Sequence, residues 1–352
     1  MERVGDRADP PACPDRFEWS RHWEVDPGAR SHFGGALLIG LRNSPAGPEE
    51  RRLTYLEEIE DAKAQASRFL RAKGVAERYL RFDREGPVPV RRPTVPTDTR
   101  SEFLANRAMG DWAENRLAEA LADVTGLHVV HYGEADTIAA GDDGFRDFYL
   151  SRMESVRRFG KRPDLLLFDE RICPANVAAE PTAALLDVAR RARAAIEVRS
   201  SKVEAQLYIA AREAEIRQGK RGGRVCPSFT VKVEDLIIVY RWLQHHAVPQ
   251  FYAQVFFDSV YLISVLDIFR ALRSNHGITI EQNANNQLKS TIHIPITAGR
   301  QIGRFTRLPR FEARERVTRL GRHDAYVEPV GGALELDGNA VRESGLSGPR
   351  PG

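Results

Sequence analysis

The spacing of hydrophobic and polar residues predicts helices that alternate with strands. Over 54–74, apolar residues recur every three or four positions, as on one face of a helix, and Gly74 ends the pattern. Further helices are predicted over 101–126, 147–162, 182–194, 202–219 and 233–248. Strands, or strand composition, are found over 128–132, 163–170, 194–201, 251–264 and 291–297. This alternation predicts an α/β fold, with a mixed central β-sheet flanked by helices.

Breaks in this pattern divide the chain into three parts. Residues 1–30 are rich in Pro, Asp and Arg and are expected to lack a fixed fold, and the proline-rich segment 85–100 is expected to be a linker. We therefore predict an N-terminal helical region with this linker over 1–95 and a main domain over 96–300. A basic C-terminal extension with a frayed tail is predicted over 301–352.

Composition narrows the class of protein. Hydrophobic residues make up 42% of the chain, as in ordinary globular proteins. No apolar run approaches the ~20 residues of a membrane span, and the first residues lack a signal-peptide core. Cys13, Cys173 and Cys226 lie far apart, which argues against a disulfide framework or a zinc site. We expect a cytoplasmic protein.

The net charge of +3 does not by itself indicate a nucleic-acid-binding protein, but the basic residues gather in three places. They lie in the segments 152–162, 220–224 and 300–322, and the last carries eight arginines against two glutamates. Such groups contact phosphates and give non-specific affinity for DNA. The alternative interpretation is a solvated, arginine-rich surface.

Two carboxylates are predicted to meet at the ends of neighbouring strands. Asp164 lies near the start of the strand over 163–170, and Glu197 lies within the strand over 194–201. Because side chains alternate along a strand, Glu197 and Arg199 share one face. If the two strands are neighbours, Asp164 lies beside Glu197.

Phosphodiester hydrolysis requires this combination of groups. Mg²⁺ prefers oxygen ligands and typically takes one or two carboxylates together with waters and the substrate phosphate. A nearby cation then orients the attacking water or stabilises the developing charge. Asp164, Glu197 and Arg199 supply these groups, so the residues predict a Mg²⁺ site.

The segments RPDLLLF (162–168) and AIEVRSSK (195–202) resemble the two motifs of the PD-(D/E)xK nucleases. The resemblance implies a mixed sheet flanked by helices, with Asp164 and Glu197 as metal ligands. In that family a lysine two residues after the glutamate assists the attacking water. Arg199 stands at that position here, and an arginine stabilises charge but does not exchange protons near neutral pH.

Three basic residues are candidates for the role of that lysine. Arg199 is one, and Lys202, where the chain turns towards a helix, is slightly preferred over Lys232 in SFTVKVEDL. Nucleases of this type also often place a helix glutamate ahead of the aspartate strand. Glu114, in GDWAENRL, matches that pattern and is a candidate third metal ligand, the alternative being a solvated helix residue.

The closer resemblance is to type II restriction endonucleases of the AccI-like and XamI-like group. It rests also on SFTVKVEDL and VPQFYAQVFFDSVYLIS and covers roughly residues 100–300. It implies Mg²⁺-dependent hydrolysis of double-stranded DNA at a specific short, palindromic site, and it makes 96–300 the endonuclease catalytic core. Two-fold symmetry suits such sites, so a homodimer is expected. A cognate DNA methyltransferase is expected as a functional, not a physical, partner.

Two other interpretations remain open at this point. One is a DNA repair or recombination nuclease on the same fold that recognises DNA structure instead of sequence. The other is a DNA-binding protein that has lost catalysis, for which Arg199 in the lysine position is the main argument.

Overall fold

The computed structural model describes residues 48–80, 82, 101–132, 145–172, 188–220, 222–274, 277–283, 287–317, 321 and 323–346. All of them belong to one compact unit, Ala46–Gly352. The predicted unstructured region 1–30, the predicted linker 85–100 and residues 182–187 of the predicted helix 182–194 lie outside the described residues.

The helices follow the predicted periodicity closely. They are α1 (Pro48–Ala72), α2 (Ser101–Thr125), α3 (Phe145–Phe159), α6 (Ala205–Arg217), α7 (Val233–His246), α8 (Val265–Ser274) and α9 (Gly338–Glu343), with the short 3₁₀ helices η1 (Glu77–Tyr79), η2 (Gln287–Lys289) and η3 (Ile296–Ala298). The predicted helices that correspond to α1, α2, α3, α6 and α7 are confirmed, with ends that differ by a few residues. None of the helices in the described residues is long and apolar enough to cross a lipid bilayer.

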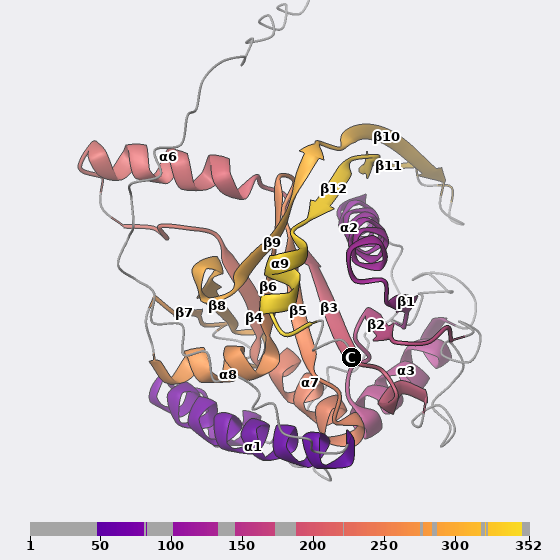
Figure 1. Cartoon of the computed structure of the whole chain (residues 1–352). Coiled ribbons are helices and arrows are strands. Elements are labelled where there is room, and N and C mark those ends of the chain that lie inside the picture. The colour runs from indigo at the N-terminus through magenta and orange to yellow at the C-terminus, as the bar shows by residue number, and fades with distance from the viewer. Residues whose placement is uncertain are drawn as a thin grey trace, which may run out of the picture. The chain divides into compact units, whose positions relative to one another are not determined.

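The strands form one large sheet and two small ones. They are β1 (His128–His131), β2 (Leu165–Phe168), β3 (Ala194–Ser200), β4 (Ser228–Lys232), β5 (Gln250–Val255), β6 (Ser259–Ser264), β7 (Thr279–Glu281), β8 (Thr291–Pro295), β9 (Arg300–Arg307), β10 (Arg310–Val317), β11 (His323–Val330) and β12 (Ala333–Leu336). The large sheet has seven strands in the order β1-β2-β3-β5-β6-β9-β12 (Figure 1). Strands β3 and β5 are parallel, and the other neighbours are antiparallel. The predicted mixed α/β sheet is confirmed.

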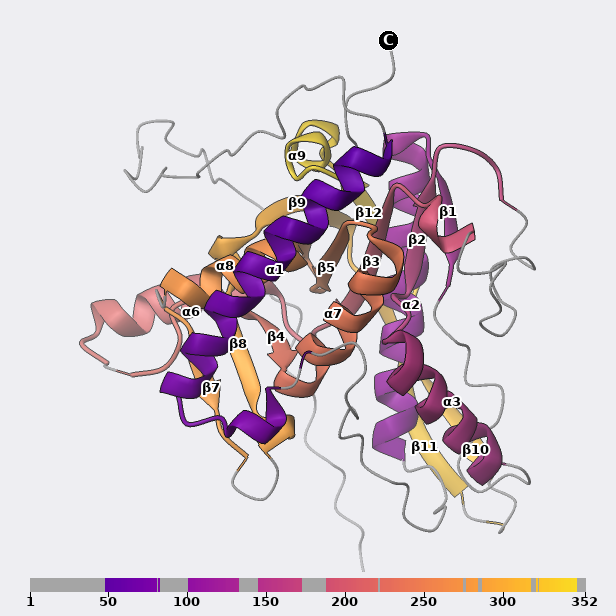
Figure 2. The same cartoon turned by 90° about the horizontal axis from the view of Figure 1, so that it is seen from below.

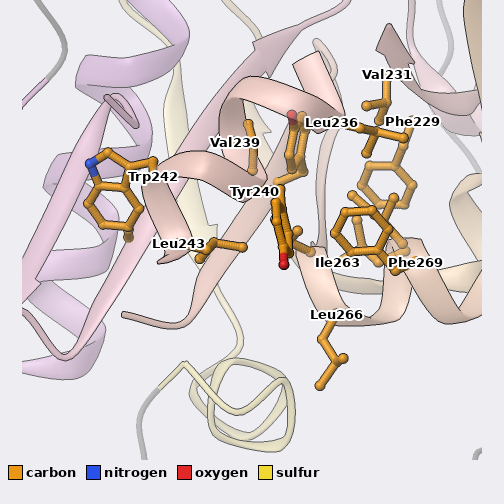
Figure 3. Packing of buried hydrophobic residues seen from close by; sticks show 14 of the residues in the cluster. Phe229, Val231, Leu236, Val239, Tyr240, Trp242, Leu243, Ile263, Leu266 and Phe269 are labelled. Carbon is orange, nitrogen blue, oxygen red and sulfur yellow. The ribbon is translucent and has the colours of Figure 1, made fainter. Parts of the chain in front are cut away.

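Both faces of the large sheet are buried, because side chains that alternate along its strands enter two separate hydrophobic clusters. One cluster joins the sheet to α1, α7 and α8, and the other joins it to α2 and α9. Figure 2 shows α7 and α2 on opposite sides of β3. Figure 3 shows the first cluster, where Tyr240 and Leu243 of α7 lie near Ile263 of β6 and Leu266 of α8. A polar side chain in the middle of β3 therefore lies between the sheet and a helix that covers it.

The C-terminal segment contributes to the large sheet. Strand β9 pairs with β6, and β12 pairs with β9, so two of the seven strands come from residues 300–336. The predicted boundary near residue 300 therefore lies next to a strand of the same sheet that carries β3. The division of the chain into 1–95, 96–300 and 301–352 stays a prediction.

Candidate active site

Asp164 and Glu197 lie side by side at one edge of the paired strands β2 and β3. The two strands are antiparallel, with Leu165 opposite Ile196, and the same register carried one residue further places Asp164 opposite Glu197. Oδ2 of Asp164 accepts a hydrogen bond from the backbone N–H of Val198, at 2.6 Å. The backbone of β3 thus holds the Asp164 carboxylate against its neighbour.

Glu197 is almost completely enclosed. Its side chain is 1% exposed, and its Oε1 forms ion pairs with Lys161 and with Nη2 of Arg199, the latter at 3.2 Å. Its Oε2 is also buried but has no hydrogen-bond partner among the residues that the structure describes. A buried carboxylate oxygen without a partner is costly, so this atom is well suited to bind a cation that is not part of the chain.

Arg199 bridges two carboxylates. Its Nη2 donates to Oδ2 of Asp235, in the first turn of α7, at 2.9 Å, and its guanidinium lies 5.9 Å from the centre of the Tyr252 ring. Burial lowers the pKa of Arg199, but Glu197 and Asp235 outweigh that effect and raise it. For Asp235, burial raises the pKa. The charges of Arg199, Lys161 and Lys232 oppose this effect and hold the pKa below its usual range. Arg199 is therefore a permanently charged link between β3 and α7.

Asp164 and Glu114 have raised pKa values, because their surroundings disfavour the negatively charged forms. Burial, followed by the negative charge of Glu197, raises the pKa of Asp164, against the opposing effect of Lys161. Burial and then the charge of Asp164 raise the pKa of Glu114, on α2, and Glu197 adds to this effect. Glu114 is thus close enough to the pair to share its electrostatic field. Carboxyl groups held in this way gain from a cation that neutralises them.

The predicted site residues do not all come together. Asp164, Glu197 and Arg199 are in direct or neighbouring contact, and Glu114 is coupled to them. Lys202 and Lys232 are both exposed, and within the described part of the chain neither forms a hydrogen bond or ion pair with Asp164 or Glu197. Lys232 instead acts on Asp235, whose pKa it lowers through its charge and through a backbone hydrogen bond.

Sequence reasoning missed two residues of this cluster. Asp235 was not singled out within the predicted helix 233–248, and Lys161 was counted only among the basic residues of the segment 152–162. In the structure Asp235 binds Arg199, and Lys161 binds Glu197. The one available signal for Lys161 was its position three residues before Asp164, at the same end of β2.

The donor set fits a Mg²⁺ ion bound through few protein ligands. In the part of the chain that the structure describes, no group of three or more His, Cys, Asp or Glu side chains is arranged to hold a metal ion. Mg²⁺ does not need such a group, because it usually binds one or two carboxylates and keeps several waters. Asp164 and Glu197, with the unpartnered Oε2 of Glu197, supply carboxylate oxygens of this kind.

The cluster combines buried negative charge with cations at the edge of a rigid sheet. Such an arrangement can bind a hard cation and can stabilise negative charge on a phosphate that approaches from solvent. The side chains of Lys161 and Arg199 are 28% and 30% exposed, so the two cations that pair with the enclosed Glu197 reach the protein surface. This chemistry suits hydrolysis of a phosphodiester bond.

Comparison with known families identifies the chain. The family model of the AccI restriction endonuclease matches residues 73–222 and 220–345, a span that includes Asp164, Glu197 and all the strands of the large sheet. No curated protein and no solved structure gave a match. The predicted resemblance to AccI-like restriction endonucleases is confirmed, and a restriction endonuclease is a DNA hydrolase. The chain therefore belongs to the AccI restriction endonuclease family.

Proposed function

We propose that the chain is a type II restriction endonuclease that cuts double-stranded DNA at a specific short, palindromic site in a Mg²⁺-dependent reaction. The observation that carries this proposal is the cross-strand pair of Asp164 and Glu197, with cations bound at Oε1 of Glu197 and an unpartnered Oε2. Family membership supports DNA as the substrate.

Each residue of the cluster has a distinct role in this proposal. Asp164 and Glu197 hold Mg²⁺, and Glu114 extends the acidic side of the site from α2. When bound, Mg²⁺ supplies charge to a non-bridging phosphate oxygen and lowers the pKa of a nearby water. Arg199 stabilises the negative charge that develops on the phosphate. Of the three basic candidates predicted from the sequence, it is the one that contacts Glu197.

The proposal extends to assembly and context. A palindromic site presents the same scissile bond on both strands, and a two-fold symmetric dimer places one active site at each. We therefore propose a homodimer that acts in the cytoplasm. A cognate DNA methyltransferase protects the host DNA as a functional partner.

Substitution of the two carboxylates tests this function. Asp164→Asn and Glu197→Gln should abolish cleavage of a long duplex of known sequence in Mg²⁺, because each removes a negative charge needed by the cation. Asp169→Asn is the matched control, since Asp169 lies at the other end of β2, is 65% exposed and pairs with Arg193. The wild type and the control should give the same discrete bands.

Two results would contradict the proposal. Wild-type rates in Asp164→Asn would remove Asp164 from the site, and cutting confined to branched or damaged DNA would favour a repair or recombination nuclease. The arginine in the usual lysine position favours a third candidate, a DNA-binding protein without catalysis. Sequence-specific binding with no cleavage under any divalent ion would establish that one.

A further inference from the structure

The position two residues after Glu197 on β3, where the nucleases that this sequence resembles carry a lysine, is occupied by an arginine. Arg199 stands there, and both carboxylates that it contacts, Glu197 and Asp235, compensate its charge. Lys202, just after β3, and Lys232, the last residue of β4, are exposed and do not contact the carboxylate pair within the described residues. The structure, however, brings another lysine to Glu197 from a different element.

We infer that Lys161, in the loop between α3 and β2, supplies the lysine ammonium group of this active site and contacts the reacting phosphate or its attacking water. This inference rests on the proposed nuclease function. Lys161 lies three residues before Asp164, instead of two residues after Glu197. Because β2 and β3 are antiparallel, the residues just before β2 and those at the end of β3 lie at the same edge of the strand pair. Lys161 therefore reaches Glu197 from before β2, as a lysine two residues after Glu197 would from β3.

The contacts of Lys161 support a role at the phosphate. Its Nζ donates to Oε1 of Glu197, which is 1% exposed, while the Lys161 side chain is 28% exposed. An ammonium group has three donors, and this is the one bond that Nζ makes among the residues that the structure describes. The other two donors are therefore available to oxygens that arrive from solvent. Arg199, by contrast, is bound to carboxylates on β3 and on α7.

Lys161 also acts on carboxyl groups of the cluster that it does not contact. Its charge lowers the pKa of Glu114, of Asp164 and of Asp235. These carboxyl groups come from α2, from the start of β2 and from α7, so one ammonium group is in electrostatic reach of three separate elements. A lysine on the protein surface outside the site would not couple to all of them.

The backbone fixes Lys161 in this place. Its N–H donates to the carbonyl oxygen of Ile238 in α7, at 3.0 Å. The preceding residue is Gly160, with φ +87°, and a Cβ at this position would lie 2.3 Å from the backbone N of Trp242. Only glycine permits both this conformation and this approach of the loop to α7. A group held on packed backbone keeps the geometry that catalysis requires.

The test separates chemistry from folding and from metal binding. We would measure single-turnover cleavage at saturating enzyme for Lys161→Met and Lys161→Arg, with Lys73→Met, an exposed lysine just after α1, as the control. Ca²⁺ binding by calorimetry and thermal unfolding would be measured on the same proteins. Asp164→Asn would be assayed in parallel.

The expected result is a specific loss of rate. Lys161→Met should lower the single-turnover rate by about 10²–10³-fold, because a charge that stabilises the transition state is removed. Its Ca²⁺ affinity should stay the same or rise, since Oε1 of Glu197 is released from a competing cation. Lys161→Arg should recover part of the rate, and Lys73→Met should match the wild type.

Three outcomes would overturn the inference. If Lys161→Met cuts at the wild-type rate while Asp164→Asn does not cut, Lys161 is not the working lysine but the nuclease function stands. If Lys161→Met loses Ca²⁺ binding and thermal stability together with activity, its role is structural. If the wild type itself cuts no DNA, the proposed function fails, and the inference fails with it.

Discussion

At the scale of single residues, the buried histidine of α7 shows how packing sets protonation. The His246 ring stacks on Trp242 at a centroid distance of 4.3 Å, and its Nδ1 donates to the Trp242 carbonyl oxygen at 2.9 Å. Its Nε2 is buried without a partner in the described part of the chain. Burial lowers the pKa of His246 to about 4, and the nearby charges of His245 and Arg190 add to this shift.

His246 should therefore make folding stability depend on pH. Below the ordinary histidine pKa of about 6.5, the unfolded chain takes up a proton that the folded chain does not. The stability linked to this group is complete above that pH and is lost as the pH falls towards 4, by about 2 kcal/mol at pH 5. We predict that urea unfolding at pH 7 and pH 5 will show a smaller pH effect in His246→Gln than in the wild type. Equal pH effects in the two proteins would contradict this.

The residues of the site differ in how far sequence could predict them. Asp164 and Glu197 follow from strand alternation, because both lie at ends of apolar runs whose facing is set by a period of two. Asp235 and Lys161 do not follow from any local pattern. Their roles depend on how α7 and the loop after α3 pack against β3, which is a property of tertiary structure.

At the scale of elements, amphipathic helices were easier to predict than the C-terminal strands. The run over 251–264 has clear strand composition, but it forms two strands, β5 and β6, because the chain turns at Phe256–Asp258. Strand β9 was not predicted from the sequence, because its arginines obscure the alternation of apolar and polar residues. Its Ile302 and Phe305 are buried, whereas Arg304 and Arg307 are exposed, so composition indicated a basic tail where the structure has a sheet strand.

The arginines of β9 are candidates for contact with DNA phosphates. Arg304 and Arg307 are exposed and form no ion pair with any described residue, whereas Arg314 of β10 is paired with Glu312 and Glu328. Each phosphate contact contributes about 0.9 to the slope of log K against log salt concentration.

We therefore predict that the double variant Arg304→Gln, Arg307→Gln will bind duplex DNA more weakly, with a salt slope smaller by about 2. Arg314→Gln is the matched control, because its charge is already compensated, and its slope should equal that of the wild type. Titrations at several salt concentrations in Ca²⁺ would measure both. An unchanged slope in the double variant would place the DNA elsewhere.

At the scale of the whole molecule, the buried charges of the site are partly compensated without a metal. Glu197 is paired with Lys161 and Arg199, Asp235 is paired with Arg199, and Asp164 accepts a backbone hydrogen bond. The two hydrophobic clusters on either side of the sheet hold the surrounding structure. We expect the fold to persist when divalent ions are removed.

Metal removal should therefore separate activity from stability. Chelation with EDTA should stop cleavage while the protein still unfolds cooperatively, and added Mg²⁺ should raise the unfolding free energy by about 2.7 kcal/mol at 100 times its Kd. Glu197→Gln should lose most of this Mg²⁺-dependent gain. Thermal unfolding with and without the ion would measure it, and an equal gain in the variant would show that Mg²⁺ binds at another place.

The carboxylate pair forms only when β2 and β3 pair in the correct register. Leu165 lies opposite Ile196, and this alignment brings Asp164 next to Glu197. A slip by a single residue would turn one of the two carboxylates to the opposite face of the sheet, towards α2, and would leave the other alone. Under the proposed function, we expect a chain that pairs these strands wrongly to be inactive, so that a misfolded copy would not cut the DNA of the cell that makes it.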